Sequence, residues 1–192
     1  MLSHKNHFIE KGLYPLGSCT MKYNPKLHES LVRHTCFANL HPYQPECTLQ
    51  GALELLYELQ KDLAEISGMA QVTLQPVAGA QGEFTGIKII SAYHKAKGNH
   101  HKTKIIIPDS AHGTNPATCN LVGFDVVELK SNPDGRCDIE RLRELVDENT
   151  AGFMLTNPNT LGLFESQIEE ISSILHSVDA LIYMDGANLN AL

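Results

Sequence analysis

The stretch "KIIIPDSAHGTNPATCNLVGFDVVEL", residues 104–129, contains two short apolar runs separated by a polar turn and a helical segment. The runs at 104–109 and 124–129 have the length of buried strands, and a short helix is expected to begin near Asn115. Parallel neighbouring strands need a crossover connection, which is usually a helix. The stretch therefore predicts one strand–helix–strand unit.

The same alternation continues on both sides of this unit. Upstream, the run "VTLQP" at 72–76 is expected to form a strand before a helix from about 82 to 96. Downstream, the order is helix 138–148, strand 152–159, helix 164–178 and strand 180–186. The pattern predicts an α/β fold with a mainly parallel sheet flanked by helices on both faces.

The part of the chain before this alternation is different in character. Residues 1–45 are rich in Pro, Gly, Asn and His, and they predict an extended arm with one short helix near 24–33. Residues 46–192 are expected to form one larger α/β domain. It opens with "LQGALELLYELQKDLAEISG" at 49–68, which predicts an amphipathic helix closed by Gly68, and its apolar stripe is expected to face a core.

Composition excludes several classes of function. With 22 acidic and 15 basic residues the net charge is −7, so no basic field is available for a nucleic-acid partner. No apolar window reaches the length of a membrane span, and the N-terminus lacks the pattern of a signal peptide. The five cysteines are odd in number and never paired as CxxC, which predicts a reducing cytoplasm or mitochondrial matrix and no zinc site. The histidine-rich segment 94–102 is interpreted as a solvated loop rather than a metal site.

In open parallel sheets, ligands bind beyond the carboxyl ends of the strands. After the run at 72–76, Gly79, Ala80 and Gln81 lie at the turn into a helix, where free N–H groups and the helix dipole favour an anion such as phosphate. The alternative is that the small residues serve only a tight turn. The spacing matches neither a P-loop nor a dinucleotide-binding motif, which argues against a nicotinamide-dependent enzyme.

Polar residues follow the later strands in the same way. His112 stands beside Ser110 and Thr114, where its ring could lie over a flat ligand, although Ser110 or Thr114 could simply cap the helix while His112 is solvated. Asn157 follows the strand at 152–159, and Asp185 ends the strand at 180–186. A carboxylate in that position could bind a sugar hydroxyl, a metal or a protonated ring nitrogen.

Taken together, these strand ends contain the parts that a site for pyridoxal phosphate requires. They are a helix N-terminus for the phosphate, an imidazole for the ring face, a polar donor for the phenolic oxygen, and an acid for the pyridinium nitrogen. An acid beside that nitrogen keeps it protonated, so the ring can accept electrons when a bond to the α-carbon of a substrate breaks.

Beyond these parts, the sequence resembles the glycine dehydrogenase (decarboxylating) family, the P-proteins of the glycine cleavage system, in their C-terminal half or separate second subunit. The motifs that carry the resemblance are "YPLGSCTMKYNPK" (14–26), "HPYQPE" (41–46), "QGALELLYELQKDLAEISGM" (50–69), "LQPVAGAQGEFTG" (74–86), "PDSAHGTNPA" (108–117), "LTNPNTLGLFE" (155–165) and "DGANLNA" (185–191). The resemblance implies the large domain of a pyridoxal-phosphate enzyme of fold type I.

It also implies roles for individual residues. Gly79, Ala80 and Gln81 would bind the phosphate, His112 would stack on the ring, Thr114 and Asn157 would lie near its edge, and Asp185 would pair with its nitrogen. Four residues of the arm, Ser18, Cys19, Thr20 and Lys22, would line the substrate entrance, or the arm would instead pack at a subunit interface.

The implied reaction is the decarboxylation of glycine, followed by transfer of the aminomethyl group to the lipoyl arm of the H-protein. The implied partners are the other P-protein subunit or half and the T- and L-proteins of the pathway.

One departure from the family is expected to matter. The lysine that binds the cofactor covalently lies after the "DGAN" acid in the family, whereas no lysine follows Asp185 in this sequence. We therefore expect a fragment, truncated before that lysine and the small C-terminal domain, that is inactive alone. The alternative is a non-catalytic remnant or interaction subunit that binds the cofactor weakly or not at all.

Overall fold

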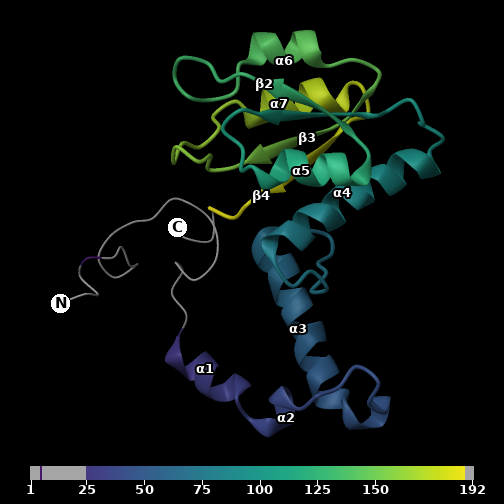
Figure 1. Ribbon diagram of the computed structural model, residues 1–192, viewed down its shortest axis with the longest axis vertical. Helices are drawn as coiled ribbons and strands as arrows, with labels where there is room; N and C mark the ends of the chain where they lie inside the picture. Colours follow the sequence, from purple (N-terminus) through teal and green to yellow (C-terminus); the bar gives the residue numbers. More distant parts are fainter. Residues whose placement is uncertain (1–4, 6–24, 189–192) are drawn as a thin grey trace. The chain divides into compact units, whose positions relative to one another are not determined.

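The computed structural model describes residue 5 and residues 25–188, and Figure 1 shows how their helices and strands are arranged. The chain divides into two compact units, the smaller made of Tyr23–Val77 and the larger of Met1–Lys22 and Ala78–Leu192. The larger unit contains the sheet together with Gly79, His112, Asn157 and Asp185. The two units are described separately.

The smaller unit is helical. Its elements are α1 (Lys26–Val32), α2 (Thr35–Ala38), the 3₁₀ helix η3 (Glu46–Thr48) and α3 (Gln50–Ser67). Helix α3 ends where the sequence predicted, because Gly68 adopts a left-handed conformation with φ of 66° and its N–H returns to the carbonyl of Ala64 or Glu65.

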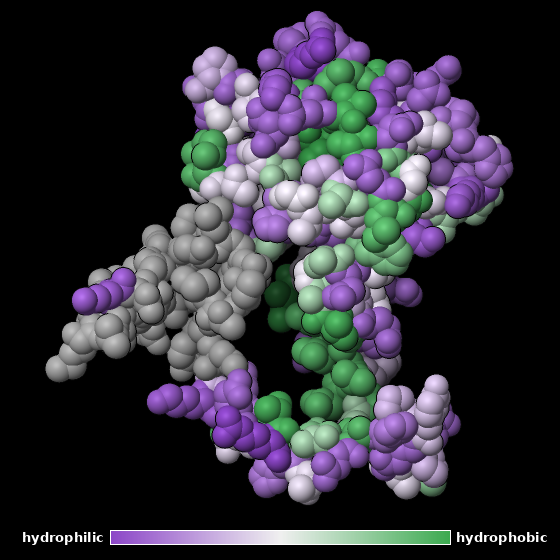
Figure 2. Space-filling model, in the orientation of Figure 1, coloured by the Kyte–Doolittle hydropathy of each residue, from purple (hydrophilic) through white to green (hydrophobic). Residues whose placement is uncertain are grey.

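The apolar stripe of α3 does not face a core in the described structure, so that expectation is wrong. Leu53 is 43% exposed, Leu56 46% and Ile66 81%, and α3 buries none of its residues. Figure 2 shows hydrophobic surface, in green, along α3. The spacing of apolar residues defines which face of a helix is apolar, but it does not provide the surface that would cover that face.

The expected strand at 72–76 is also absent, because these residues form neither helix nor strand. A strand needs a neighbouring backbone with which to exchange hydrogen bonds, and an apolar run alone does not supply one. The backbone carbonyl of Val72 accepts instead from a side chain, the Nε2 amide of Gln60, at 2.6 Å.

The described part of the larger unit has four strands, whereas five were expected within residues 46–192. They are β1 (Lys104–Pro108), β2 (Asp125–Leu129), β3 (Thr150–Thr156) and β4 (Leu181–Asp185). All pairings are parallel, in the order β2-β1-β3-β4. The helices are α4 (Gly79–Ala96), α5 (Thr114–Val122), α6 (Ile139–Leu145) and α7 (Ile168–His176). Figure 1 shows α4 and α5 on one face of the sheet and α6 and α7 on the other, which confirms the predicted α/β class.

The two faces of the sheet have separate cores because successive side chains of a strand point in opposite directions. Ile105 and Ile107 of β1 pack with residues of α4 and α5, whereas Ile106 packs with residues of α6 and α7. Every residue of β3 is buried, as expected for a central strand covered on both faces. This packing fixes the strand ends that carry the polar residues.

Gly86 allows α4 to lie close to β4. A Cβ atom at this position would stand 2.4 Å from Cε2 of Tyr183, well inside van der Waals contact. Hydrogen is therefore the only side chain that fits without a shift of the helix or the ring. None of the described helices combines the length and apolar character needed to span a membrane.

Candidate functional site

The strand order places a topological switch point between β1 and β3 at the carboxyl edge of the sheet. The chain passes from β1 to β2 on one side of β1, whereas β3 pairs on the other side. Connections that leave neighbouring parallel strands in opposite directions open a crevice where open α/β sheets bind ligands. His112 follows β1, Asn157 follows β3, and Asp185 ends β4.

Asp185 is a buried acid of this edge, with 9% of its surface exposed. Its Oδ1 accepts the N–H of Ala187 at 3.0 Å, and its Oδ2 accepts from Nδ2 of Asn115 at 3.3 Å. Both donors are neutral, and no cationic side chain of residues 25–188 forms an ion pair with this carboxylate. A buried carboxylate is costly without a positive partner, so Asp185 is suited to a ligand that presents a protonated nitrogen.

Two neighbouring polar atoms are buried with no hydrogen-bond partner among the described residues: Oδ1 of Asn115 and Oγ1 of Thr156. Asn115 is fully buried, and its donation to Asp185 fixes which way its amide points because a carboxylate only accepts. Thr156 is the register partner of Asp185 across β3 and β4. Unpaired buried polar atoms are uncommon, and these are placed where a bound polar group could pair with them.

The residues that the sequence predicted to bind a phosphate form the first turn of α4, and their role stays a prediction. Gly79, Ala80 and Gln81 form this turn and are exposed, and Ala78, which precedes it, makes no side-chain cap. The first N–H groups of a helix have no acceptor within the helix, and the helix dipole adds a partial positive charge. The turn is thus equipped to bind a phosphate.

Hydrogen bonds bring the starts of α4 and α5 to the end of β4. Oγ1 of Thr114, in the first turn of α5, donates to Oε1 of Glu83 in α4 at 2.7 Å. Asn115, the next residue of α5, donates to Asp185. The structure therefore gathers the turn at 79–81, the loop with His112 and the carboxylate of Asp185 at one edge of the sheet.

His112 is exposed on the loop between β1 and α5. Its Nδ1 lies 2.7 Å from Oγ1 of Thr114, and the backbone N–H of Thr114 lies 3.3 Å from the same nitrogen. The imidazole is therefore held against the start of α5. That it stacks on a cofactor ring stays a prediction.

Asn157 is held by two hydrogen bonds beside Asp185. Its N–H donates to the backbone carbonyl of Asp185, and its Oδ1 accepts the N–H of Glu165, both at 3.1 Å. Because the side-chain oxygen is engaged, Nδ2 remains as the group that can donate to a ligand. This is the role that the sequence predicted for Asn157, and it stays a prediction.

Sequence reasoning missed Glu83 and Asn115. An acid in the first turns of a helix is usually explained by the helix dipole, and an asparagine at a helix start by capping, so neither residue carried a distinctive signal. Their partners lie 31 and 70 residues away in the chain, beyond the reach of local patterns. The predicted entrance residues Ser18, Cys19, Thr20 and Lys22 lie outside the described residues.

The segment 94–102 is not a fully solvated loop, which corrects the sequence interpretation. His94 lies in α4 and is 2% exposed, with Nε2 bonded to the carbonyl of Ala151 at 2.8 Å. Lys102 is 7% exposed, although His100 and His101 are exposed as expected. The residues at 25–188 contain no cluster of three side chains suited to a metal, so no metal site is indicated within them.

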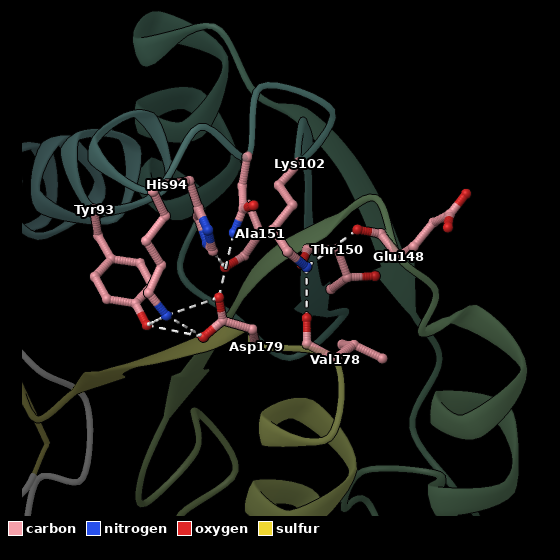
Figure 3. A network of polar contacts seen from close by, with 10 residues as sticks. Tyr93, His94, Lys102, Glu148, Thr150, Ala151, Val178 and Asp179 are labelled. Carbon is pink, nitrogen blue, oxygen red and sulfur yellow. Dashed lines mark hydrogen bonds and ion pairs between the residues drawn. The ribbon is translucent and has the colours of Figure 1, made fainter.

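Lys102 donates to three backbone carbonyls, those of Glu148, Thr150 and Val178, as Figure 3 shows. Burial lowers the pKa of Lys102 from its ordinary value and outweighs the opposing effect of nearby acids such as Asp179. These carbonyls lie at the beginnings of strands, whereas Asp185 lies at the end of one. The buried lysine therefore belongs to the opposite edge of the sheet and cannot meet a ligand at Asp185.

Comparisons with known proteins agree with this fold. The model of the aminotransferase class-V family matches residues 81–190. The probable glycine dehydrogenase (decarboxylating) subunit 2 proteins of Halalkalibacterium halodurans and Alkaliphilus oremlandii are each 59% identical over 191 residues. The alignment includes all of this chain but only 39% of either relative, so the chain spans about two fifths of their length.

Two solved structures share the fold. A crystal structure of glycine decarboxylase (P-protein) of the glycine cleavage system, in inhibitor-bound form, gives a TM-score of 0.74 at 22% identity, covering 95% of this chain and 40% of that chain. A NifS-like protein gives a TM-score of 0.64 at 18% identity, covering 83% and 44%.

At these identities the two structures show the fold alone. The family model matches more than half of the sequence, including Asp185, His112 and Asn157. The chain belongs to the aminotransferase class-V family and is a homologue of glycine dehydrogenase (decarboxylating) subunit 2.

Proposed function

We propose that this chain carries the cofactor-binding part of a pyridoxal-phosphate-dependent glycine decarboxylase, which passes the aminomethyl group of glycine to the lipoyl arm of the H-protein. The observation that carries the proposal is the buried carboxylate of Asp185, which has two neutral donors and no cationic partner among the described residues. A protonated pyridine nitrogen is the complement of such a group.

The other residues of the edge fit the rest of the cofactor. The N–H groups of Gly79, Ala80 and Gln81 would bind the phosphate, and the imidazole of His112 would cover one face of the ring. Nδ2 of Asn157 would donate to the phenolic oxygen, and Thr114 would hold His112 at the ring edge. The orphaned Oγ1 of Thr156 and Oδ1 of Asn115 support a bound polar group at this edge.

When bound, pyridoxal phosphate supplies an electron sink for the bond between the α-carbon and the carboxylate of glycine. The residues of this chain would set the conditions for that chemistry. Asp185 would keep the proton on the ring nitrogen, and Asn115 together with the N–H of Ala187 would hold Asp185 in its orientation. The first turn of α4 would anchor the phosphate and so fix the ring relative to Asp185.

The partners and the location are part of the same proposal. The subunit 2 names of the relatives support a second P-protein subunit. The resemblance to P-proteins of the glycine cleavage system implies the H-, T- and L-proteins as further partners. The bacterial relatives support a bacterial cytoplasmic location. Because the chain covers 39% of these relatives, the activity is proposed for the complete protein that carries this sequence.

Binding is tested with pyridoxamine 5′-phosphate, which has no aldehyde and so cannot form imines with surface lysines. We expect calorimetric titration of the chain to show binding at one site, and pyridoxamine without phosphate to bind at least about tenfold more weakly because it cannot use the turn of α4. Equal affinity for the two compounds, or no binding of either, would contradict the proposal.

The choice of glycine is tested on the complete protein with lipoylated H-protein. We expect glycine-dependent exchange of labelled bicarbonate into the carboxyl group of glycine, and no exchange with alanine. Exchange that does not depend on H-protein, or a preference for alanine, would contradict the proposed substrate and partner.

A further inference from the structure

Glu83 is the second buried carboxylate beside Asp185 in the described chain, with 6% of its surface exposed. Its Oε1 accepts from Oγ1 of Thr114 at 2.7 Å, and its Oε2 accepts from Oγ1 of Thr118 at 3.2 Å. Thr114 and Thr118 are four residues apart in α5, so they share one face of this helix, which is turned toward α4. Both oxygens of Glu83 are thereby directed at the start of α5.

Thr114 links Glu83 to His112. Its Oγ1 lies 2.7 Å from Oε1 of Glu83 and 2.7 Å from Nδ1 of His112. A hydroxyl has one hydrogen, and a carboxylate can only accept, so the hydrogen of Thr114 goes to Glu83. Oγ1 must then accept from His112, which places a hydrogen on Nδ1 of the imidazole.

A second contact of His112 would instead favour the tautomer with its hydrogen on Nε2. The backbone N–H of Thr114 lies 3.3 Å from Nδ1 of His112 and would need a lone pair on that nitrogen. The two arrangements exclude each other. The chain of two 2.7 Å contacts ends on a carboxylate, and hydrogen bonds to ionised groups are shorter and stronger than those between neutral ones. The hydroxyl contact therefore prevails.

We propose that Glu83 is a positioning residue that acts through Thr114 to hold His112 as its Nδ1–H tautomer, with the lone pair on Nε2. This inference rests on the proposed function for its use: the imidazole would present Nε2 as an acceptor to a substrate group above the cofactor ring. The hydrogen-bond chain itself needs only residues of this structure.

His94 provides an internal reference for the experiment. Its Nε2 lies 2.8 Å from the carbonyl of Ala151, and a carbonyl only accepts, so His94 is the Nε2–H tautomer. It lies near the other end of α4, at the opposite edge of the sheet from His112. A variant that disturbs only the chain from Glu83 to His112 leaves the ring ¹H and ¹⁵N chemical shifts of His94 unchanged, whereas unfolding moves the signals of both residues to those of free histidine.

The test is ¹H–¹⁵N correlation spectroscopy of the chain with ¹⁵N-labelled histidine, without cofactor, at a pH where the imidazoles are neutral. We expect His112 to be Nδ1–H and His94 to be Nε2–H. Thr114→Val and Glu83→Ala should convert His112 to the Nε2–H form that free histidine favours, with His94 unchanged. Thr114→Ser, which keeps the hydroxyl, should retain Nδ1–H.

Nε2–H at His112 in the unsubstituted chain would overturn the proposal, and so would retention of Nδ1–H in Thr114→Val with His94 unchanged. A variant in which the His94 signal also changes is replaced by Glu83→Gln. The glutamine oxygen still accepts from Thr114 but lacks the charge, so the Nδ1–H fraction of His112 should fall. If the Nδ1–H fraction of His112 is the same in Glu83→Gln as in the unsubstituted chain, the charge of Glu83 does not hold the tautomer and the proposal is overturned.

This measurement is independent of the proposed function. Failure of pyridoxamine 5′-phosphate to bind would contradict the cofactor site but leave the tautomer of His112 as predicted. Binding of pyridoxamine 5′-phosphate together with an Nε2–H tautomer at His112 would support the cofactor site and contradict the proposed role of Glu83.

Discussion

Asn115 and Asp185 are 70 residues apart in the sequence, and Nδ2 of Asn115 donates to Oδ2 of Asp185 at 3.3 Å inside the protein. The contact joins the start of α5 to the end of β4. Asn115 is fully buried, and no other described side chain donates to Asp185. The orientation of the carboxylate therefore depends on this one amide and on the N–H of Ala187.

Asn115→Ala removes this donor and leaves Oδ2 of Asp185 buried without a partner. We expect the free energy of unfolding to fall by about 1–3 kcal/mol, the cost of an unsatisfied buried group. Urea denaturation followed by circular dichroism measures the change. In Asp185→Asn the same substitution of Asn115 should cost less, and equal costs in the two backgrounds would show that the residues are not coupled.

Gly86 and Gly82 both lie in α4 but differ in what surrounds them. Gly86→Ala places Cβ 2.4 Å from Cε2 of Tyr183, so we expect a loss of stability of about 1–3 kcal/mol. A Cβ at Gly82 meets nothing within 4 Å, so Gly82→Ala should be neutral or stabilising by up to about 1 kcal/mol. Thermal unfolding of both variants compares them. Equal destabilisation would contradict the close packing of α4 on β4.

Leu142 and Leu56 test which apolar residues form the core. Leu142 of α6 is fully buried among residues of the sheet and α7, so Leu142→Ala should lower stability by about 2–5 kcal/mol. Leu56 of α3 is 46% exposed, and Leu56→Ala should change stability by less than about 0.5 kcal/mol. Chemical denaturation measures both changes. A large effect of Leu56→Ala would mean that the stripe of α3 is covered in solution.

The stability of the chain should fall at alkaline pH because of Cys119. Burial, followed by the charge of Glu83, raises the pKa of this thiol from 9.0 to about 12. The folded state therefore favours the protonated thiol, and its contribution is complete below pH 9.0 and is lost as the pH rises toward 12. The slope is up to about 1.4 kcal/mol per pH unit.

Burial also raises the pKa of Tyr183 from 10.0 to about 12, which should steepen the loss above pH 10.0. Urea midpoints on either side of pH 9.0, under reducing conditions, test the effect. Cys119→Ala should flatten the dependence, and the exposed Cys47 provides the control because Cys47→Ala should leave it unchanged. An equal slope in Cys119→Ala and the unsubstituted chain would refute the assignment.

The sequence predicted those parts of the fold and site that depend on local order. Alternating apolar runs and helical segments identify a parallel sheet, and its strand ends then identify His112, Asn157 and Asp185 as neighbours, because parallel strands end at the same edge. The expected helix ending at Gly68 was also correct, since a glycine stop is a local signal.

The features that were missed depend on what lies elsewhere in the chain. The run at 72–76 has the composition of a strand but no strand beside it, and the stripe of α3 is apolar but uncovered in the described structure. Glu83 and Asn115 gain their meaning only from partners that the fold brings to them. The burial of Lys102 also depends on distant residues. Its ammonium group donates to three backbone carbonyls far along the chain, whereas the sequence alone predicts an exposed lysine.

The proposed cofactor site depends most on the charge of Asp185, and the affinity of the chain for pyridoxamine 5′-phosphate measures the role of this charge most directly. Asp185→Asn removes the charge and keeps the shape, and we expect affinity to fall about tenfold to a hundredfold, as for a lost hydrogen bond to a charged group. Asp125→Asn, at an exposed position where β2 begins, is the matched control and should bind as the unsubstituted chain does. Unchanged affinity in Asp185→Asn, or an equal loss in Asp125→Asn, would contradict a cofactor site built on Asp185.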